Sequence, residues 1–253
     1  MLSKAKLKII RSLELKKNRR ETGLFVAEGP KVVGDLLPYF HPQLVVATSS
    51  WLESAPALPR TEVAEVTEEE LAKASFLKAP QEVLAVFENR ATTEADQEIP
   101  FNDELILMLD DVQDPGNVGT IVRIADWFGI RHIVCSPGTA DAFSPKVVQA
   151  TMGAIARVRL HYLPLLPLLV SLPKDIPVYG TFLEGDNIYQ LPLSAHGIII
   201  MGNEGNGISP AIGQMVTDKL FIPSWPGGCK TSESLNVAVA TAITCSEFRR
   251  RKS

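Results

Sequence analysis

The sequence has few cysteines, no long apolar run and no apolar core near its start. Its three cysteines, Cys135, Cys229 and Cys245, are odd in number and far apart, which argues against both a disulfide scaffold and a cysteine zinc site. The longest apolar runs, such as 197–201, are much shorter than the roughly 18 residues that a membrane span needs. Residues 1–20 are basic and do not resemble a secretory signal. We therefore expect a cytoplasmic protein without a membrane segment.

Several familiar active-site signatures are also missing. The sequence contains no G-x-x-x-x-G-K-[ST] phosphate loop and no G-x-S-x-G nucleophile elbow. The glycines that begin at Gly202 read G-x-x-G-x-G, which differs from the dinucleotide fingerprint and disfavours a nucleotide-dependent oxidoreductase. The four histidines are scattered, so no metal site is expected. Measuring the binding of NADH would test the oxidoreductase alternative.

Charge is distributed unevenly in a chain whose formal net charge is −4. The residues 249–252 are all basic, and positions 1–20 hold eight basic residues against Glu14 alone. The eight are Lys4, Lys6, Lys8, Arg11, Lys16, Lys17, Arg19 and Arg20. Basic ends on an acidic body suit a polyanion, such as a nucleic acid, held at one face. The alternative is that the lysines are simply the solvated face of a first helix.

The first 88 residues alternate between helical and strand patterns, which is typical of a small α/β domain. Thr67, with Glu70 three residues later, has the pattern of a capping box. Helices are predicted at 3–19, 30–37 and 67–74, and strands at 24–27, 44–48 and 83–87. Residues 89–103 are largely polar and aperiodic. They are predicted to link this domain, residues 1–88, to a second one at 104–253.

The second domain repeats the alternation on a larger scale. Short apolar runs between helical patterns indicate buried parallel strands in a sheet with helices on both faces. Strands are predicted at 105–109, 132–134, 178–181, 198–201 and 220–222, and helices at 118–128, 145–152, 165–172 and 234–250. Ligands of such sheets bind outside the carboxyl ends of the strands, so the residues that follow each strand are the candidate site.

Three polar clusters follow the predicted strands. The first is Asn117-x-Gly119-x-x-x-Arg123, the second is the run IMGNEGNG at 200–207, and the third is IP at 222–223 followed by SLNV at 234–237. In this order and over about residues 104–250, they resemble the three motifs of the SpoU (TrmH-like) RNA 2′-O-ribose methyltransferases of the SPOUT class. Residues 1–88 look like the substrate-binding domain often attached to this family, which is similar to ribosomal protein L30e.

The resemblance implies methyl transfer from S-adenosylmethionine to a ribose 2′-hydroxyl of ribosomal or transfer RNA. It also implies a C-terminal trefoil knot that forms the cofactor pocket, and a homodimer. By resemblance, the residues that line the cofactor pocket are Thr181, Gly202, Ile222 and Leu235. Plain core packing is the alternative for Ile222 and Leu235.

The polar motif residues are the candidate catalytic group: Asn117, Arg123, Glu204, Ser234 and Asn236. Arg123 either removes the hydroxyl proton, as in the usual family proposal, or binds a phosphate and positions the hydroxyl, since a guanidinium stays protonated. Glu204 is expected to pair with Arg123, and Ser234 either caps the last helix or contacts substrate. A binding-only relative would have lost these residues.

One segment departs from the compact connection expected in this family. Residues 224–233 form a longer loop that contains Trp225 and Lys230. Trp225 either stacks on a flipped base or plugs an apolar surface.

Overall fold

The computed structural model describes residues 2–89, 98–227 and 232–250. The chain forms two compact units, Met1–Asp96 with Asp141–Ala156, and Gln97–Ala140 with Arg157–Ser253. Segment 141–156 therefore packs with the first unit, although it lies inside the predicted second domain. The predicted boundaries 1–88, 89–103 and 104–253 stay a prediction, and most of the proposed linker, residues 90–97, lies outside the described residues.

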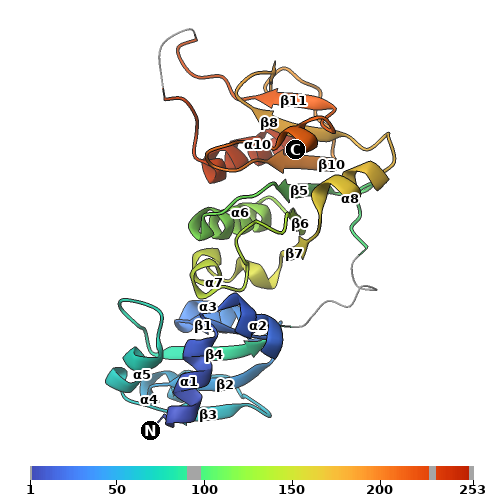
Figure 1. The fold of residues 1–253 in the computed structure, drawn as a ribbon. Helices are drawn as coiled ribbons and strands as arrows, with labels where there is room; N and C mark the ends of the chain where they lie inside the picture. Colours follow the sequence, from blue (N-terminus) through green and yellow to red (C-terminus); the bar gives the residue numbers. More distant parts are fainter. Residues whose placement is uncertain (1, 90–97, 228–231, 251–253) are drawn as a thin grey trace. The chain divides into compact units, whose positions relative to one another are not determined.

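The N-terminal unit contains a four-stranded sheet in the order β1-β4-β2-β3 (Figure 1). β4 pairs antiparallel with β1 and β2, and β3 lies parallel to β2 at the edge. Ile10, Leu13 and Leu84 are among the fully buried side chains of its core. The elements are α1 (Lys4–Ser12), α2 (Lys16–Thr22), β1 (Leu24–Glu28), α3 (Pro30–Leu36), β2 (Pro42–Ala47), α4 (Ser49–Ser54), β3 (Glu62–Glu65), α5 (Glu68–Ala74) and β4 (Val83–Glu88).

The capping box at the start of α5 is confirmed. The hydroxyl of Thr67 accepts the N–H of Glu70, and the carboxylate of Glu70 accepts the N–H of Thr67. The sequence patterns did not predict α4 or β3. β3 is mostly exposed, so it lacks the apolar alternation by which strands are found.

The predicted helix at 3–19 is two helices, α1 and α2. Leu13 is fully buried at the break, and Leu15 has an extended backbone with φ −88° and ψ 129°. The guanidinium of Arg19 donates to the carbonyl oxygens of Leu13 and Glu14, at 2.7 Å each. It thus satisfies two acceptors near the end of α1, which explains how the break is stabilised.

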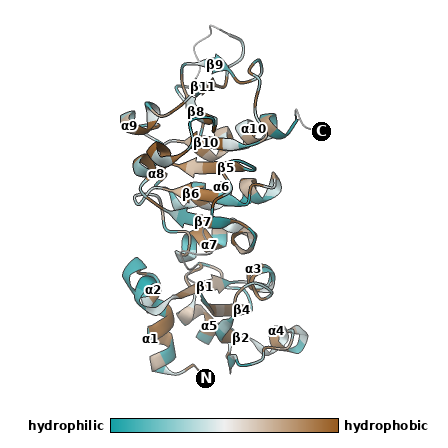
Figure 2. Cartoon of the chain, turned by 90° about the vertical axis from the view of Figure 1, so that its right-hand side faces the viewer, coloured by the Kyte–Doolittle hydropathy of each residue, from teal (hydrophilic) through white to brown (hydrophobic). Residues whose placement is uncertain are grey.

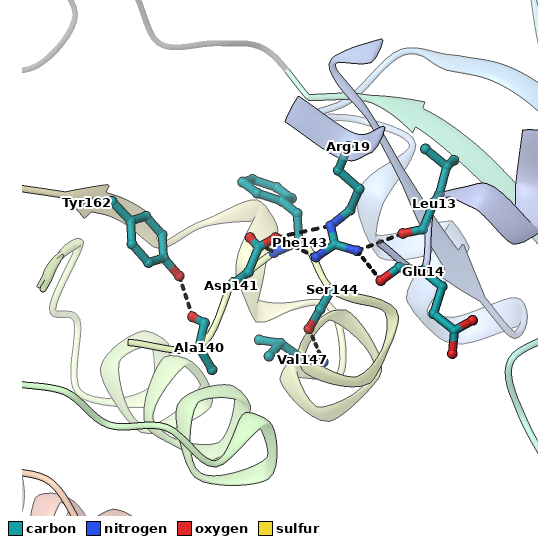
Figure 3. Close-up of polar contacts among 9 residues, drawn as sticks. All are labelled: Leu13, Glu14, Arg19, Ala140, Asp141, Phe143, Ser144, Val147 and Tyr162. Carbon is teal, nitrogen blue, oxygen red and sulfur yellow. Dashed lines mark hydrogen bonds and ion pairs between the residues drawn. The ribbon is translucent and has the colours of Figure 1, made fainter. Parts of the chain in front are cut away.

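Arg19 also ties these helices to segment 141–156 (Figure 3). Its Nε and Nη2 atoms donate to Oδ2 of Asp141 at 3.0 and 2.6 Å, and only 6% of Arg19 is exposed. Phe143 packs on Phe25 of β1 with 4.9 Å between the ring centroids. The segment continues into α7 (Pro145–Thr151) and the short 3-10 helix η2 (Ala154–Ala156). These contacts explain why it belongs with the N-terminal unit.

The second unit contains a seven-stranded parallel sheet in the order β7-β6-β5-β10-β8-β11-β9 (Figure 1). The predicted α/β fold with a parallel sheet is confirmed. β5 and β10 are buried along their whole length, and β5 and β6 are brown in the hydropathy colouring of Figure 2. The strands are β5 (Leu105–Leu109), β6 (His132–Cys135), β7 (Arg159–Tyr162), β8 (Val178–Phe182), β9 (Asp186–Asn187), β10 (Gly197–Met201) and β11 (Asp218–Phe221).

The helices of this unit are α6 (Pro115–Trp127), α8 (Leu165–Ser171), α9 (Pro210–Gly213) and α10 (Val237–Arg250). α10 packs against α6, and the guanidinium of Arg249 donates to the carbonyl oxygens of Phe128 and Gly129 at 2.8 and 3.2 Å. The last helix therefore caps the carboxyl end of α6. Among the described residues, no helix is both long and apolar enough to cross a membrane.

Candidate functional site

Neighbouring strands β5 and β10 bring the loops of the first two motifs together. Asn203, just after β10, donates its Nδ2 hydrogen to the carbonyl oxygen of Asp111 at 2.7 Å. Its Oδ1 accepts the N–H groups of Gly205 and Asn206 at 2.9 and 3.0 Å. Asn203 therefore closes the glycine-rich loop on itself and fastens it to the loop that follows β5.

Glu204 lies at the centre of a hydrogen-bond network. Its Oε1 accepts from Nδ2 of Asn117 at 3.0 Å and from the N–H of Asp114 at 3.1 Å. Its Oε2 accepts from the N–H of Gln113 at 3.2 Å. Desolvation acts against the charged carboxylate, but these hydrogen bonds outweigh it and hold the pKa of Glu204 below its usual range. Glu204 is therefore an ionised acceptor at neutral pH.

Asn236 extends this network from the start of α10. Its Oδ1 accepts the N–H groups of Ala238 and Val239 at 2.9 and 3.3 Å, so its Nδ2 faces Oδ1 of Asn117, at 3.0 Å. Asn117 must then present its own Nδ2 to Glu204. The helix amides thus set the orientation of both asparagines, and all three motifs meet through three side chains.

Asn236, and not Ser234, caps the last helix. α10 begins at Val237, three residues later than predicted, which leaves Ser234 in the exposed segment before it. Its side chain has no recorded hydrogen bond to a described residue, so the capping alternative for Ser234 is not observed. Contact of Ser234 with substrate stays a proposal.

Arg123 stands apart from this network. The expected pair between Arg123 and Glu204 does not form; Glu204 accepts from Asn117 and two main-chain amides instead. α6 begins at Pro115, earlier than predicted, so Asn117 and Arg123 both lie on it, about 9 Å apart along its axis and about 120° apart around it. Arg123 is exposed and has no recorded hydrogen bond or ion pair with a described residue. Its guanidinium is available to a ligand.

Gly202 is required by the loop itself. A Cβ atom at this position would lie 2.2 Å from the carbonyl carbon of Gly207 and 2.3 Å from the nitrogen of Ile208. Both atoms belong to the main chain and cannot move aside cheaply. Any side chain at position 202 would therefore displace the returning strand of the loop.

Of the four predicted cofactor residues, Thr181 lies near the end of β8, Gly202 and Ile222 follow β10 and β11, and Leu235 precedes α10. In the described part of the chain, no hydrogen bond is recorded from the main-chain N–H groups of Gly202, Ile222 or Leu235. Leu235 is 47% exposed, and the hydroxyl of Thr181 donates to the carbonyl oxygen of Ile200 at 3.2 Å. We call these three main-chain N–H groups open amides. Open amides beside apolar side chains suit a flat heterocycle with a polar edge, such as the adenine of S-adenosylmethionine. The residues present fit this cofactor.

No group of three or more metal-ligating side chains occurs among the residues that the structure describes. His132 and His161, which read as isolated in the sequence, are buried next to each other with 3.0 Å between Nδ1 and Nε2. Burial lowers the pKa of His132 and lowers that of His161 to about 4. The pair is therefore neutral at pH 7 and belongs to the packing of β6 on β7.

Sequence reasoning missed the residues that support the site through their main chain. Gln113 and Asp114 contact Glu204 with backbone amides, which leave no mark in the sequence. Asp110 is buried and accepts the N–H of Ser209 at 2.7 Å. The one signal available in the sequence was the position of Asp110. It is a carboxylate directly after an apolar strand, and a buried charge needs a partner.

Trp225 is 93% exposed, so it does not plug an apolar surface of the described residues. Its stacking on RNA stays a proposal. Lys230 lies outside the described residues.

Two family models match the chain in the order of its units. The SpoU rRNA Methylase family matches residues 104–246, and the MRM3-like substrate binding domain matches residues 4–85. A fold and a site of this kind define an RNA methyltransferase. The chain belongs to the SpoU rRNA methylase family. The family and enzyme class expected from the motifs are thereby confirmed.

Relatives match over nearly the whole length. The chain is 32% identical to the 23S rRNA (guanosine(2553)-2′-O)-methyltransferase RlmP of Bacillus subtilis, with 96% of each covered. A solved structure described as a TrmH-family RNA methyltransferase from Porphyromonas gingivalis is 45% identical, with a TM-score of 0.89 and 99% of each chain covered. The AdoMet-bound rRNA methyltransferase of Sinorhizobium meliloti is 31% identical, with a TM-score of 0.86 over 99% of this chain and 96% of that one.

Proposed function

We propose that this protein transfers the methyl group of S-adenosylmethionine to a ribose 2′-hydroxyl of ribosomal RNA, and that its substrate is 23S rRNA. The observation that carries the proposal is the contact of all three motifs in one network, in a chain that matches a 23S rRNA 2′-O-methyltransferase over 96% of both lengths. Mapping 2′-O-methylated positions in total RNA with and without the gene tests it. Loss of one rRNA methylation is expected, whereas loss only from transfer RNA would overturn the choice of substrate.

The cofactor pocket is assigned to Thr181, Gly202, Ile222 and Leu235. S-adenosylmethionine supplies an electrophilic methyl group on a sulfonium, which loses its positive charge as the methyl leaves. The protein therefore has to align the acceptor hydroxyl and provide for its proton. The open amides of the pocket residues are suited to hold the adenine edge.

We assign Arg123 to the RNA backbone and the reacting ribose. A guanidinium keeps its proton at neutral pH, so positioning a phosphate and the hydroxyl is the role that its chemistry favours over proton removal. Its exposure and the lack of a recorded protein partner support this role. Asn117, Glu204 and Asn236 hold the loops of the three motifs together, and Ser234 is kept as a substrate contact.

The basic residues of the first helices contribute to RNA binding, but fewer of them than the sequence suggested. Arg19 is buried on Asp141, Arg11 donates to the carbonyl oxygen of Ser75, and Lys6 pairs with Glu62. Lys4, Lys8 and Arg20 are exposed and have no recorded partner among the described residues. These three are the proposed phosphate contacts.

Homodimerisation, a cytoplasmic location and the trefoil knot complete the proposal. The adjacent helices α6 and α10 expose Trp127, at 85%, and Val239, at 49%. Aromatic side chains are enriched at protein–protein interfaces, so the exposed Trp127 supports a surface of this kind. Light scattering of the purified protein tests it: a dimer is expected, and a monomer at micromolar concentration would contradict it.

A further inference from the structure

A pocket of about 480 Å³ lies entirely within the N-terminal unit. One wall is the end of α3 and the start of β2, residues 34–42, and the other is the loop 56–61. Four of the lining residues are prolines, whose fixed φ stiffens the walls before a ligand binds. The hydroxyl of Thr61 donates to the carbonyl oxygen of Pro42 at 2.9 Å and joins the walls. The pocket is therefore preformed.

The lining of the pocket combines an aromatic face with polar groups that have no recorded partner among the described residues. Phe40 is held inward, edge-on to Phe25 at 5.2 Å, whereas Tyr39 is 48% exposed. Neither the hydroxyl of Tyr39 nor the imidazole of His41 has a recorded hydrogen bond to a described residue. No carboxylate is among the lining residues. Such a lining suits a flat, uncharged ring with hydrogen-bonding edges.

Arg60 lies between two lining residues of the loop. It is exposed, and no ion pair or hydrogen bond with another described residue is recorded for it. Its φ of 61° is in the left-handed region, which is costly for a residue other than glycine. A strained residue with a free guanidinium at the rim of a pocket is an arrangement found at ligand sites.

A second cavity of the same unit gives a contrast. It is lined by Glu68, Glu69 and Glu82, which would repel a phosphate backbone. The pocket at Tyr39 has no lining carboxylate and has an unpaired arginine beside it. Of the two, only this pocket matches a polyanion that carries flat rings.

We infer that this pocket binds one unpaired nucleobase of the RNA substrate. Tyr39 stacks on the base, His41 contacts its edge, and Arg60 holds an adjacent phosphate. The inference rests on the proposed function, since it takes RNA as the substrate. The match of residues 4–85 to a substrate-binding domain supports it. Single-stranded bases are commonly recognised by stacking on aromatic side chains.

The test measures binding of the full-length protein to a fluorescein-labelled, unstructured RNA oligonucleotide by fluorescence anisotropy. Tyr39→Ala should weaken binding about tenfold or more, whereas Tyr39→Phe, which keeps the ring, should remain within about threefold. Arg60→Gln should lower the slope of log affinity against log salt by about 0.7, and Tyr39→Ala should leave that slope unchanged. The matched control is Tyr189→Ala, an equally exposed tyrosine of the second unit, which should bind as the wild type does.

Methyl transfer to 23S rRNA, measured on the same preparations, separates this inference from the proposed function. If the wild type methylates rRNA and Tyr39→Ala binds and methylates equally well, the inference fails while the function stands. If the wild type methylates no RNA, the proposed function fails. If RNA binding is unchanged in Tyr39→Ala but a proline-rich peptide binds only the wild type, the pocket is a peptide site and the inference is overturned.

Discussion

Arg19 and Arg123 illustrate two uses of the same side chain in the two units. Arg19 is buried, and four of the five N–H groups of its guanidinium donate to one carboxylate and two carbonyl oxygens, so it is committed to the protein interior. Arg123 is exposed and has no recorded protein partner among the described residues. In the sequence, Arg19 counts among the basic residues expected to attract RNA, and Arg123 stands out as a motif residue. The structure gives Arg19 a role in folding and leaves the guanidinium of Arg123 for substrate.

The carboxylates differ in the same way. Asp141 is the partner of a buried charge, so its removal leaves Arg19 uncompensated. Glu204 receives neutral donors, namely one amide side chain and two main-chain N–H groups. The first interaction holds a segment in place, and the second holds the loops of the reaction site. Removal of the Asp141 carboxylate should therefore lower mainly the stability of the fold, and removal of the Glu204 carboxylate should lower mainly catalysis.

The largest effect is expected at Asp141. Asp141→Ala should lower the free energy of unfolding by about 3–5 kcal/mol, since it leaves a buried guanidinium unpaired. Denaturant titration measures this. The matched control is Lys31→Ala, which removes an exposed pair with Asp35 and should cost less than about 1 kcal/mol. A loss at Asp141 as small as that of the control would show that the pair does not hold the segment.

Arg123 should show the opposite pattern. Arg123→Ala should reduce methyl transfer about 100-fold, equivalent to about 2.7 kcal/mol of transition-state stabilisation, with little change in unfolding free energy. S-adenosylmethionine affinity should stay within about threefold. Arg123→Lys should rescue little, because a point charge cannot replace the planar fork. Near-normal turnover of the lysine variant would contradict positioning by the planar guanidinium fork.

Glu204→Gln should have an intermediate effect, about a tenfold loss of kcat. A glutamine has one acceptor oxygen, so its amide hydrogens would face at least one of the donors that now bind the carboxylate. The pKa of Glu204 is lowered in the fold, so its contribution to stability is present above its unfolded pKa and is lost as pH falls through the folded one. The difference in unfolding free energy between wild type and variant should therefore shrink toward pH 3. A constant difference would argue against an ionised Glu204.

Sequence patterns predicted the elements whose signal is local. β5 and β10 are buried on both faces, and in the sequence they are continuous apolar runs. The capping-box pattern of Thr67 and Glu70 correctly predicted the start of a helix. The motif residues Asn117, Glu204 and Asn236 were found and do meet. The main-chain partners of Glu204, which are Gln113 and Asp114, could not be found, because hydrogen bonds between residues 91 and 90 positions apart depend on strand order.

Contacts between distant residues determine the structure at positions where the local sequence pattern is not sufficient. Helix 3–19 had a continuous helical pattern, yet the burial of Leu13 and the two bonds from Arg19 favour a break. The assignment of Gly202 to the cofactor pocket stays a proposal, and its Cβ position is closed by the main chain of Gly207 and Ile208. A valine at 202 would therefore disturb the loop itself and is not a clean test of the pocket.

The smallest expected effect concerns the remaining basic residues of the first helices. Replacing Lys4, Lys8 and Arg20 together by Gln should lower the slope of log RNA affinity against log salt by about 2, if each neutralises one phosphate. Stability should change little, since all three are exposed. A matched triple variant with Lys31, Lys73 and Lys78 changed to Gln removes the same charge from other parts of the unit. An equal change of slope in both variants would show that net charge, and not this surface, attracts RNA.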